Sequence, residues 1–188
     1  MTRSKIKTTI QEAKNYWQQI VDESDLSVDW SEADTHCWRC GCKKDLQRCH
    51  IIPDSLDGKD EPSNIVLLCK RCHADGPNVR DSEIMWDWIK AYRTPFYETF
   101  WSIQGMKEYE FIYKEKVEDE LEYILTEAGI NNSKEINQII KEELNSLQKD
   151  VSIHFGQPYL NTATMAGLYR MMLKRISSKY GVTFPKEN

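Results

Sequence analysis

The 188-residue sequence lacks several features that would assign it to a class of protein. It has no apolar run of about 18 or more residues, so we expect no membrane-spanning helix. Its first residues, Met1 to Lys5, lack the apolar core of a signal peptide, so we expect an intracellular, cytoplasmic protein.

Basic residues are in the minority. The chain has 25 Lys and Arg against 30 Asp and Glu, a formal net charge of −5. Because phosphate contacts need Lys and Arg, this balance is a mild argument against nucleic-acid binding. A local basic face is the alternative, because several cations lie in one short part of the chain. They are Arg39, Lys43, Lys44, Arg48, Lys70 and Arg71.

Cysteine is absent from most of the chain. All six cysteines lie between Cys37 and Cys72. Thiols inside cells are mostly reduced, so a disulfide framework does not explain the cluster, and metal binding does.

Four of these cysteines form two Cys-x-x-Cys pairs. The pairs are "CWRC" at 37–40 and "CKRC" at 69–72. This spacing supplies the four thiolates that Zn²⁺ binds in tetrahedral geometry, and Gly41 lets the backbone turn under the first pair. We therefore predict a structural zinc on Cys37, Cys40, Cys69 and Cys72, with reduced buried thiols as the alternative. Two cysteines remain, and for the first of them, Cys42, we predict a small buried side chain.

The hydrophobic pattern predicts mainly helices. Amphipathic spacing predicts helices over 4–23 and 81–92, followed by three more over 105–128, 133–151 and 162–180. A polar linker is expected over 24–36. Two short strands are expected over 46–52 and 64–69, joined by a polar loop with Pro, Asp and Gly.

The segment "CWRC … LQRCHIIP … SNIVLLCKRCH", about 37–73, resembles the HNH endonucleases, which are also called ββα-metal or His-Me finger nucleases. The resemblance rests on both cysteine pairs, the His-Ile-Ile-Pro strand end, the Asn before the second strand and the His after the last cysteine. The fold class implied is α+β, with a small zinc-stapled ββα-metal module embedded in a mostly α-helical chain. We predict an N-terminal helix and linker (1–35), the nuclease module (36–95) and a helical C-terminal region (96–188).

The resemblance also implies roles for individual residues. His50 would be the general base that activates water. Asn64 would brace the loop or help to hold the metal. His73 would bind the catalytic divalent cation, which would be Mg²⁺ or another ion such as Mn²⁺ or Ni²⁺. Cys49 stands where the family has Asp, Glu or His, so it is either an unusual metal ligand or an inward-packed small residue.

Other side chains near the motif have two interpretations. Arg48, Lys70 and Arg71 are candidate contacts to nucleic-acid phosphates, with solvated surface as the alternative. A run of aromatic residues suggests base stacking, but its largely helical spacing favours core packing. The run comprises Trp86, Trp88, Tyr92, Phe96, Tyr97, Phe100 and Trp101.

Three functions are compatible with these patterns. The first is a metal-dependent DNA endonuclease, a phosphodiester hydrolase. The second is a catalytically weak or inactive zinc module that binds nucleic acid or a protein. The third, less favoured, is a transcription regulator with a helix–turn–helix within 136–176, whose recognition helix would carry Arg170, Lys174 and Arg175. A double-strand cut would usually require a homodimer with two active sites.

Overall fold

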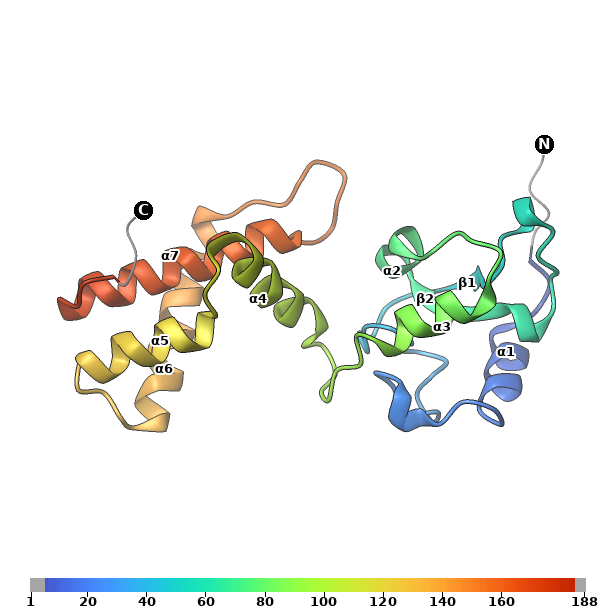
Figure 1. The fold of residues 1–188 in the computed structure, drawn as a ribbon, viewed down its shortest axis with the longest axis horizontal. Coiled ribbons are helices and arrows are strands. Elements are labelled where there is room, and N and C mark those ends of the chain that lie inside the picture. Colours follow the sequence, from blue (N-terminus) through green and yellow to red (C-terminus); the bar gives the residue numbers. More distant parts are fainter. Residues whose placement is uncertain (1–5, 185–188) are drawn as a thin grey trace. The chain divides into compact units, whose positions relative to one another are not determined.

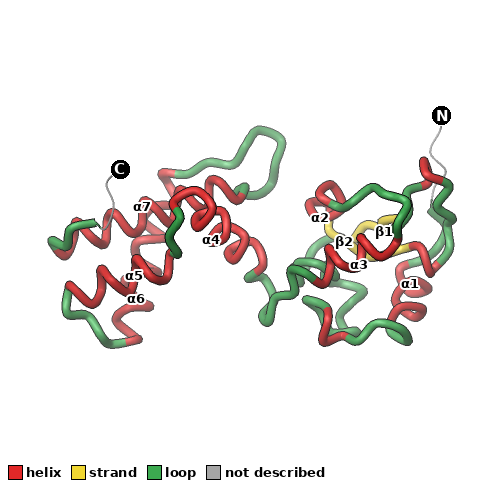
Figure 2. The backbone as a smooth tube through the Cα atoms, in the orientation of Figure 1, coloured by secondary structure: helices red, strands yellow, loops and turns green. Residues whose placement is uncertain are grey.

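The computed structural model describes residues 6–184 and divides the chain into two compact units, Met1–Phe100 and Trp101–Asn188 (Figure 1). The helices are α1 (Ile10–Trp17), α2 (Lys70–Asp75), α3 (Ser82–Lys90), α4 (Phe100–Tyr113), α5 (Val117–Glu127), α6 (Ser133–Leu147) and α7 (Thr162–Tyr180), and the strands are β1 (Leu46–His50) and β2 (Ile65–Cys69). A small sheet among helices confirms the α+β class (Figure 2). The predicted boundaries at 35 and 95 stay a prediction. Among the helices in the described range, none combines the length and apolar character needed to cross a membrane.

The first unit is built around an antiparallel pair of strands. β1 pairs with β2 in a register that sets Leu46 opposite Cys69 and His50 opposite Ile65. Every residue of β2 is buried. α1 and α2 both pack against β2, and the indole Nε1 of Trp17 on α1 donates a hydrogen bond to Ile65 O at 2.9 Å. Both predicted strands are therefore confirmed, each slightly shorter than expected.

The predicted linker over 24–36 belongs to this core. Leu26, Val28 and Ala33 are all buried. Most of the predicted aromatic packing also occurs, and Phe100 is fully buried. Phe96 is not packed in this way, because its side chain is 70% exposed.

The second unit is helical. α7 packs against both α5 and α6, and the buried residues of these helices form one apolar core. Asn161 caps the start of α7, and Gly181, with φ of +67°, ends it. The helix predicted over 162–180 is therefore confirmed at both ends.

Two predicted helices are shorter or broken. The helix expected over 4–23 covers only Ile10–Trp17, because Thr9 and Glu12 form a capping box that starts it; residues 4 and 5 lie outside the described range. The helix expected over 105–128 is two helices, α4 and α5, separated at Lys114, which has a φ of +60°. The acidic residues that follow Val117 favour a new helix start there.

Candidate metal centre and active site

The first cysteine pair lies on a tight turn. Gly41 N donates to Cys37 O at 2.8 Å, and Cys37 N donates to Cys42 O at 3.1 Å. Gly41 has a φ of +63°, and a Cβ there would lie 2.5 Å from Ser27 O. Glycine is therefore required at this position. The turn brings the sulfurs of Cys37 and Cys40 close to those of the second pair.

The second cysteine pair lies where β2 ends and α2 begins. Cys69 is the N-cap residue of α2, and its Sγ accepts the N–H of Cys72 at 3.5 Å. The register of the hairpin fixes the position of Cys69, and the cap fixes the position of Cys72 relative to it. Cys42, predicted to be a small buried residue, is only 3% exposed.

The four sulfurs converge. The Sγ atoms of Cys37, Cys40, Cys69 and Cys72 all lie within 4.8 Å of one another, and all four residues are buried. The Sγ atoms of Cys40 and Cys69 are 3.9 Å apart, and tetrahedral Zn–S bonds of about 2.3 Å would place sulfurs about 3.8 Å apart. Hydrogen bonds from the other three thiols lower the pKa of Cys69, whereas burial raises the pKa of Cys37. The cluster is compatible with the predicted structural zinc.

His50 is the last residue of β1 and is partly exposed. Alternation along the strand places it on the face that carries Arg48, opposite the face of Gln47 and Cys49. The backbone directly after it is tied to the other strand, since Ile51 N donates to Asn64 O at 2.8 Å. His50 and Asn64 therefore lie at the same end of the hairpin.

Asn64 is buried and braces the loop between the strands. Its Oδ1 accepts from Ile52 N at 2.8 Å, and its Nδ2 donates to Ile52 O at 3.0 Å and to Lys59 O at 2.8 Å. Both ends of the amide bind loop backbone. Of the two roles that the sequence left open, the observed contacts favour the brace.

His73 lies on α2, directly after Cys72. Its Nδ1 is 2.8 Å from Oε1 of Gln47 on β1. Because an amide oxygen only accepts hydrogen bonds, this pair is a hydrogen bond when Nδ1 carries the proton, and in that tautomer of the neutral ring the lone pair is on Nε2. Gln47 was not among the predicted site residues. Its position two residues before Cys49 on one strand face is the signal that could have found it.

Cys49 is packed inward and is 5% exposed. Its thiol donates to His50 O at 3.5 Å. Burial raises the pKa of Cys49 to about 12, which favours a neutral thiol at neutral pH. These observations favour the packed residue over the metal ligand, and the ligand role stays the alternative prediction.

The three predicted phosphate contacts differ in their surroundings. Arg48 donates from Nη1 to Ile6 O at 3.1 Å and to Thr8 O at 2.9 Å, so its side chain holds the N-terminal segment. Lys70 is exposed and Arg71 is partly exposed. A role in nucleic-acid binding stays a prediction for each of them.

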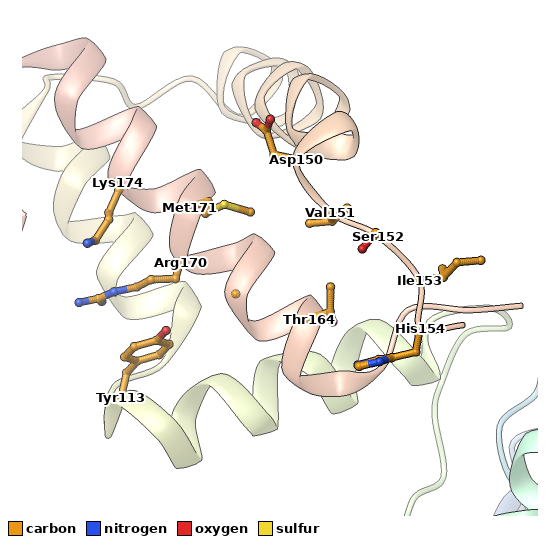
Figure 3. A pocket seen from close by; sticks show the side chains of 11 residues that line it. Tyr113, Asp150, Val151, Ser152, Ile153, His154, Thr164, Arg170, Met171 and Lys174 are labelled. Atoms are coloured by element: carbon orange, nitrogen blue, oxygen red, sulfur yellow. The ribbon is translucent and has the colours of Figure 1, made fainter. Parts of the chain in front are cut away.

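The helical unit contains a hollow of about 520 Å³ along α7, which the sequence did not predict (Figure 3). Arg170, Lys174 and Tyr113 form one wall, and the segment 150–154 lies on the other side. Nη1 of Arg170 is 3.1 Å from the buried carboxylate of Glu120. The negative charge of Glu120 therefore offsets the positive charge of Arg170.

The same helices test the helix–turn–helix interpretation. α6 and α7 are separated by residues 148–161, whereas that motif joins its helices by a turn of about three or four residues. Arg175 pairs with Asp150 at 3.0 Å. These helices therefore do not form a helix–turn–helix.

Comparison with known families gives a match over the cysteine module. The model of the HNH endonuclease family matches residues 37–75, which contain both cysteine pairs, His50, Asn64 and His73. The match indicates a nuclease or nucleic-acid-binding function for this module. No curated protein and no solved structure matches the chain.

Proposed function

We propose that this protein is a metal-dependent endonuclease that hydrolyses DNA phosphodiester bonds. The observation that carries the proposal is the match to the HNH endonuclease family over 37–75, together with the loop brace at Asn64 and the hydrogen bond at His73.

His50 is the proposed general base. A neutral imidazole accepts a proton from water at neutral pH as the water oxygen attacks phosphorus. The bond from phosphorus to one sugar oxygen breaks, and that oxygen leaves and takes up a proton from solvent. The position of His50 follows from its place at the end of β1, and Asn64 holds the backbone after it. Arg48, Lys70 and Arg71 are the proposed contacts to DNA phosphates, which would offset the acidic charge of the chain.

His73 is the proposed ligand of the catalytic cation, which would be Mg²⁺, Mn²⁺ or Ni²⁺. The fit is supported by Gln47, because metal-binding histidines commonly donate their other ring N–H to an oxygen acceptor. A bound divalent cation would supply charge neutralisation at the scissile phosphate. Cys49 contributes no oxygen, so water and phosphate oxygens would complete the shell.

The zinc on the four cysteines is proposed to be structural. A site closed by four thiolates has no open position for a substrate, so its contribution is to join β2 and α2 to the first cysteine turn. We expect Cys37→Ser to lower zinc content and folding stability together, because metal binding and folding are coupled. Retention of one zinc per chain by this variant would contradict the assignment.

The nuclease proposal is tested by plasmid cleavage. Protein depleted of loosely held metal is incubated with supercoiled plasmid and Mg²⁺, Mn²⁺ or Ni²⁺. We expect the wild type to nick or linearise the DNA and His50→Ala to lose at least about 100-fold, the usual contribution of a general base. The matched control is His154→Ala, since His154 is exposed and lies in the other unit. Equal cleavage by wild type and His50→Ala in every metal would refute the proposal.

The second candidate function is a zinc module that binds nucleic acid or a protein without cleaving. The buried thiol of Cys49, in place of a metal-binding acid or histidine, favours this alternative. Cleavage in none of the metals combined with retained DNA binding would support it. Linear plasmid formed under single-hit conditions would show that both strands are cut in one event, which favours a homodimer with two active sites. Sedimentation would test the oligomeric state.

A further inference from the structure

Arg39 lies inside the first cysteine pair and is buried, with 6% of its surface exposed. Guanidinium groups are almost never this buried without compensation, because removing a charge from water is costly. The position of Arg39 between Cys37 and Cys40 therefore requires an explanation in terms of what surrounds its charge.

Aromatic rings form part of that environment. The guanidinium carbon of Arg39 lies 4.0 Å from the ring centroid of Trp88 and 4.9 Å from the centroids of Tyr92 and Phe100. All three distances are within the range of cation–π attraction. These rings exclude water and hold the guanidinium in one place.

The charge is directed at the metal centre. Nη1 of Arg39 lies 3.7 Å from Sγ of Cys72, within hydrogen-bond distance for sulfur. The same nitrogen is 3.8 Å from Oδ2 of Asp75, whose side chain is half exposed, so that carboxylate compensates only in part. A neutral thiol is a weak partner for a buried cation, whereas a thiolate is a strong one.

Four thiolates around one Zn²⁺ carry a net charge of −2. A cation placed beside one of the sulfurs withdraws electron density from it and reduces its nucleophilicity. We propose that Arg39 is the built-in counter-cation of the zinc–thiolate centre and protects Cys72 from electrophiles. This inference rests on the structural zinc of the proposed function. In it, Arg39 acts through the sulfur of Cys72.

The test measures alkylation of the zinc-loaded full-length chain. Zinc content is measured first, then iodoacetamide is added, and mass spectrometry follows each cysteine. In the wild type we expect Cys72 to be the slowest of the four ligands to react. In Arg39→Met, whose unbranched side chain suits the aromatic surroundings, we expect Cys72 to react on the order of tenfold faster, as for loss of one charged hydrogen bond.

Two further variants separate charge from packing. Arg39→Lys keeps the cation, so we expect most of the protection of Cys72 to be retained. Lys44→Met removes the same charge from an exposed position near the cysteine turn and should leave every rate unchanged. With Co²⁺ in place of zinc, Arg39→Met should shift the sulfur-to-metal charge-transfer band to lower energy, which loss of packing alone would not do.

The outcomes are distinguishable. Equal acceleration of all four cysteines in both Arg39 variants would show a packing role and overturn the inference, as would an unchanged rate at Cys72. If Arg39→Met fails to fold, the order in which the four cysteines are alkylated in the wild type and in Arg39→Lys still tests whether Cys72 is protected. A wild type without zinc would instead refute the zinc assignment itself.

Discussion

Asn64 offers the sharpest test of how the site is held together. Replacing it with alanine removes three hydrogen bonds to the backbone of Ile52 and Lys59. Each such bond contributes about 1 kcal/mol, so we expect the free energy of unfolding of the first unit to fall by about 3 kcal/mol. With a urea dependence of about 1.5 kcal/mol per molar, the midpoint of unfolding should fall by about 2 M.

The assay is urea unfolding in excess zinc, followed by tryptophan fluorescence, since Trp17, Trp30, Trp38, Trp86 and Trp88 all lie in the first unit. The exchange rate of the Ile52 amide with solvent should rise in parallel.

The control is Ser63→Ala, which removes one surface hydrogen bond to Glu61 and should change stability by less than about 0.5 kcal/mol. Asn64→Asp should be worse than Asn64→Ala at neutral pH, because a carboxylate would face the two carbonyl oxygens that Nδ2 now binds. A stability change below about 0.5 kcal/mol for Asn64→Ala would refute the brace. Loss of cleavage without loss of stability would point instead to a role in holding the metal.

Three further results are expected. Arg170→Met leaves the buried carboxylate of Glu120 without its cation, although the Tyr109 hydroxyl still donates to it. The free energy of unfolding of the helical unit should therefore fall by about 3 kcal/mol, and adding Glu120→Gln should recover more than half of this loss in a double-mutant cycle. Gly41→Ala, which forces a Cβ to 2.5 Å from a backbone oxygen at a φ of +63°, should weaken zinc retention in a chelator competition, and unchanged retention would contradict the required turn. The hydrogen bond from the N–H of Lys7 lowers the pKa of Asp60. The contribution of Asp60 to stability is therefore fully present above the ordinary carboxyl pKa of about 3.9 and is lost as pH falls through the lower folded-state pKa. An NMR titration of the Lys7 amide should have its midpoint below about 3.9 and should lose this transition in Asp60→Asn.

The parts of the site that the sequence predicted are those encoded by short-range spacing. The two Cys-x-x-Cys pairs predicted the cluster, because each pair needs only a local turn to place its sulfurs. The hairpin followed from two short apolar runs around a polar loop. The end of α7 followed from Gly181, since a left-handed residue after a helix is a local signal.

The parts that the sequence did not predict depend on partners far away in the chain. The aromatic neighbours of Arg39 follow it by dozens of residues, so its burial has no local signal. The first helix is short because the backbone before it is held elsewhere, with the N–H of Lys7 donating to Asp60 at 2.6 Å. The break at Lys114 was missed because the apolar periodicity continues across it.

The contact between Asp60 and the N-terminal segment also constrains how this protein can vary. Asp60 and Arg48 bind main-chain N–H and C=O groups of residues 6–8, and the Lys7 side chain is exposed. Almost any residue at position 7 preserves the contact, whereas proline removes the donor. Natural variants should therefore drift widely in identity at this position while never acquiring proline there.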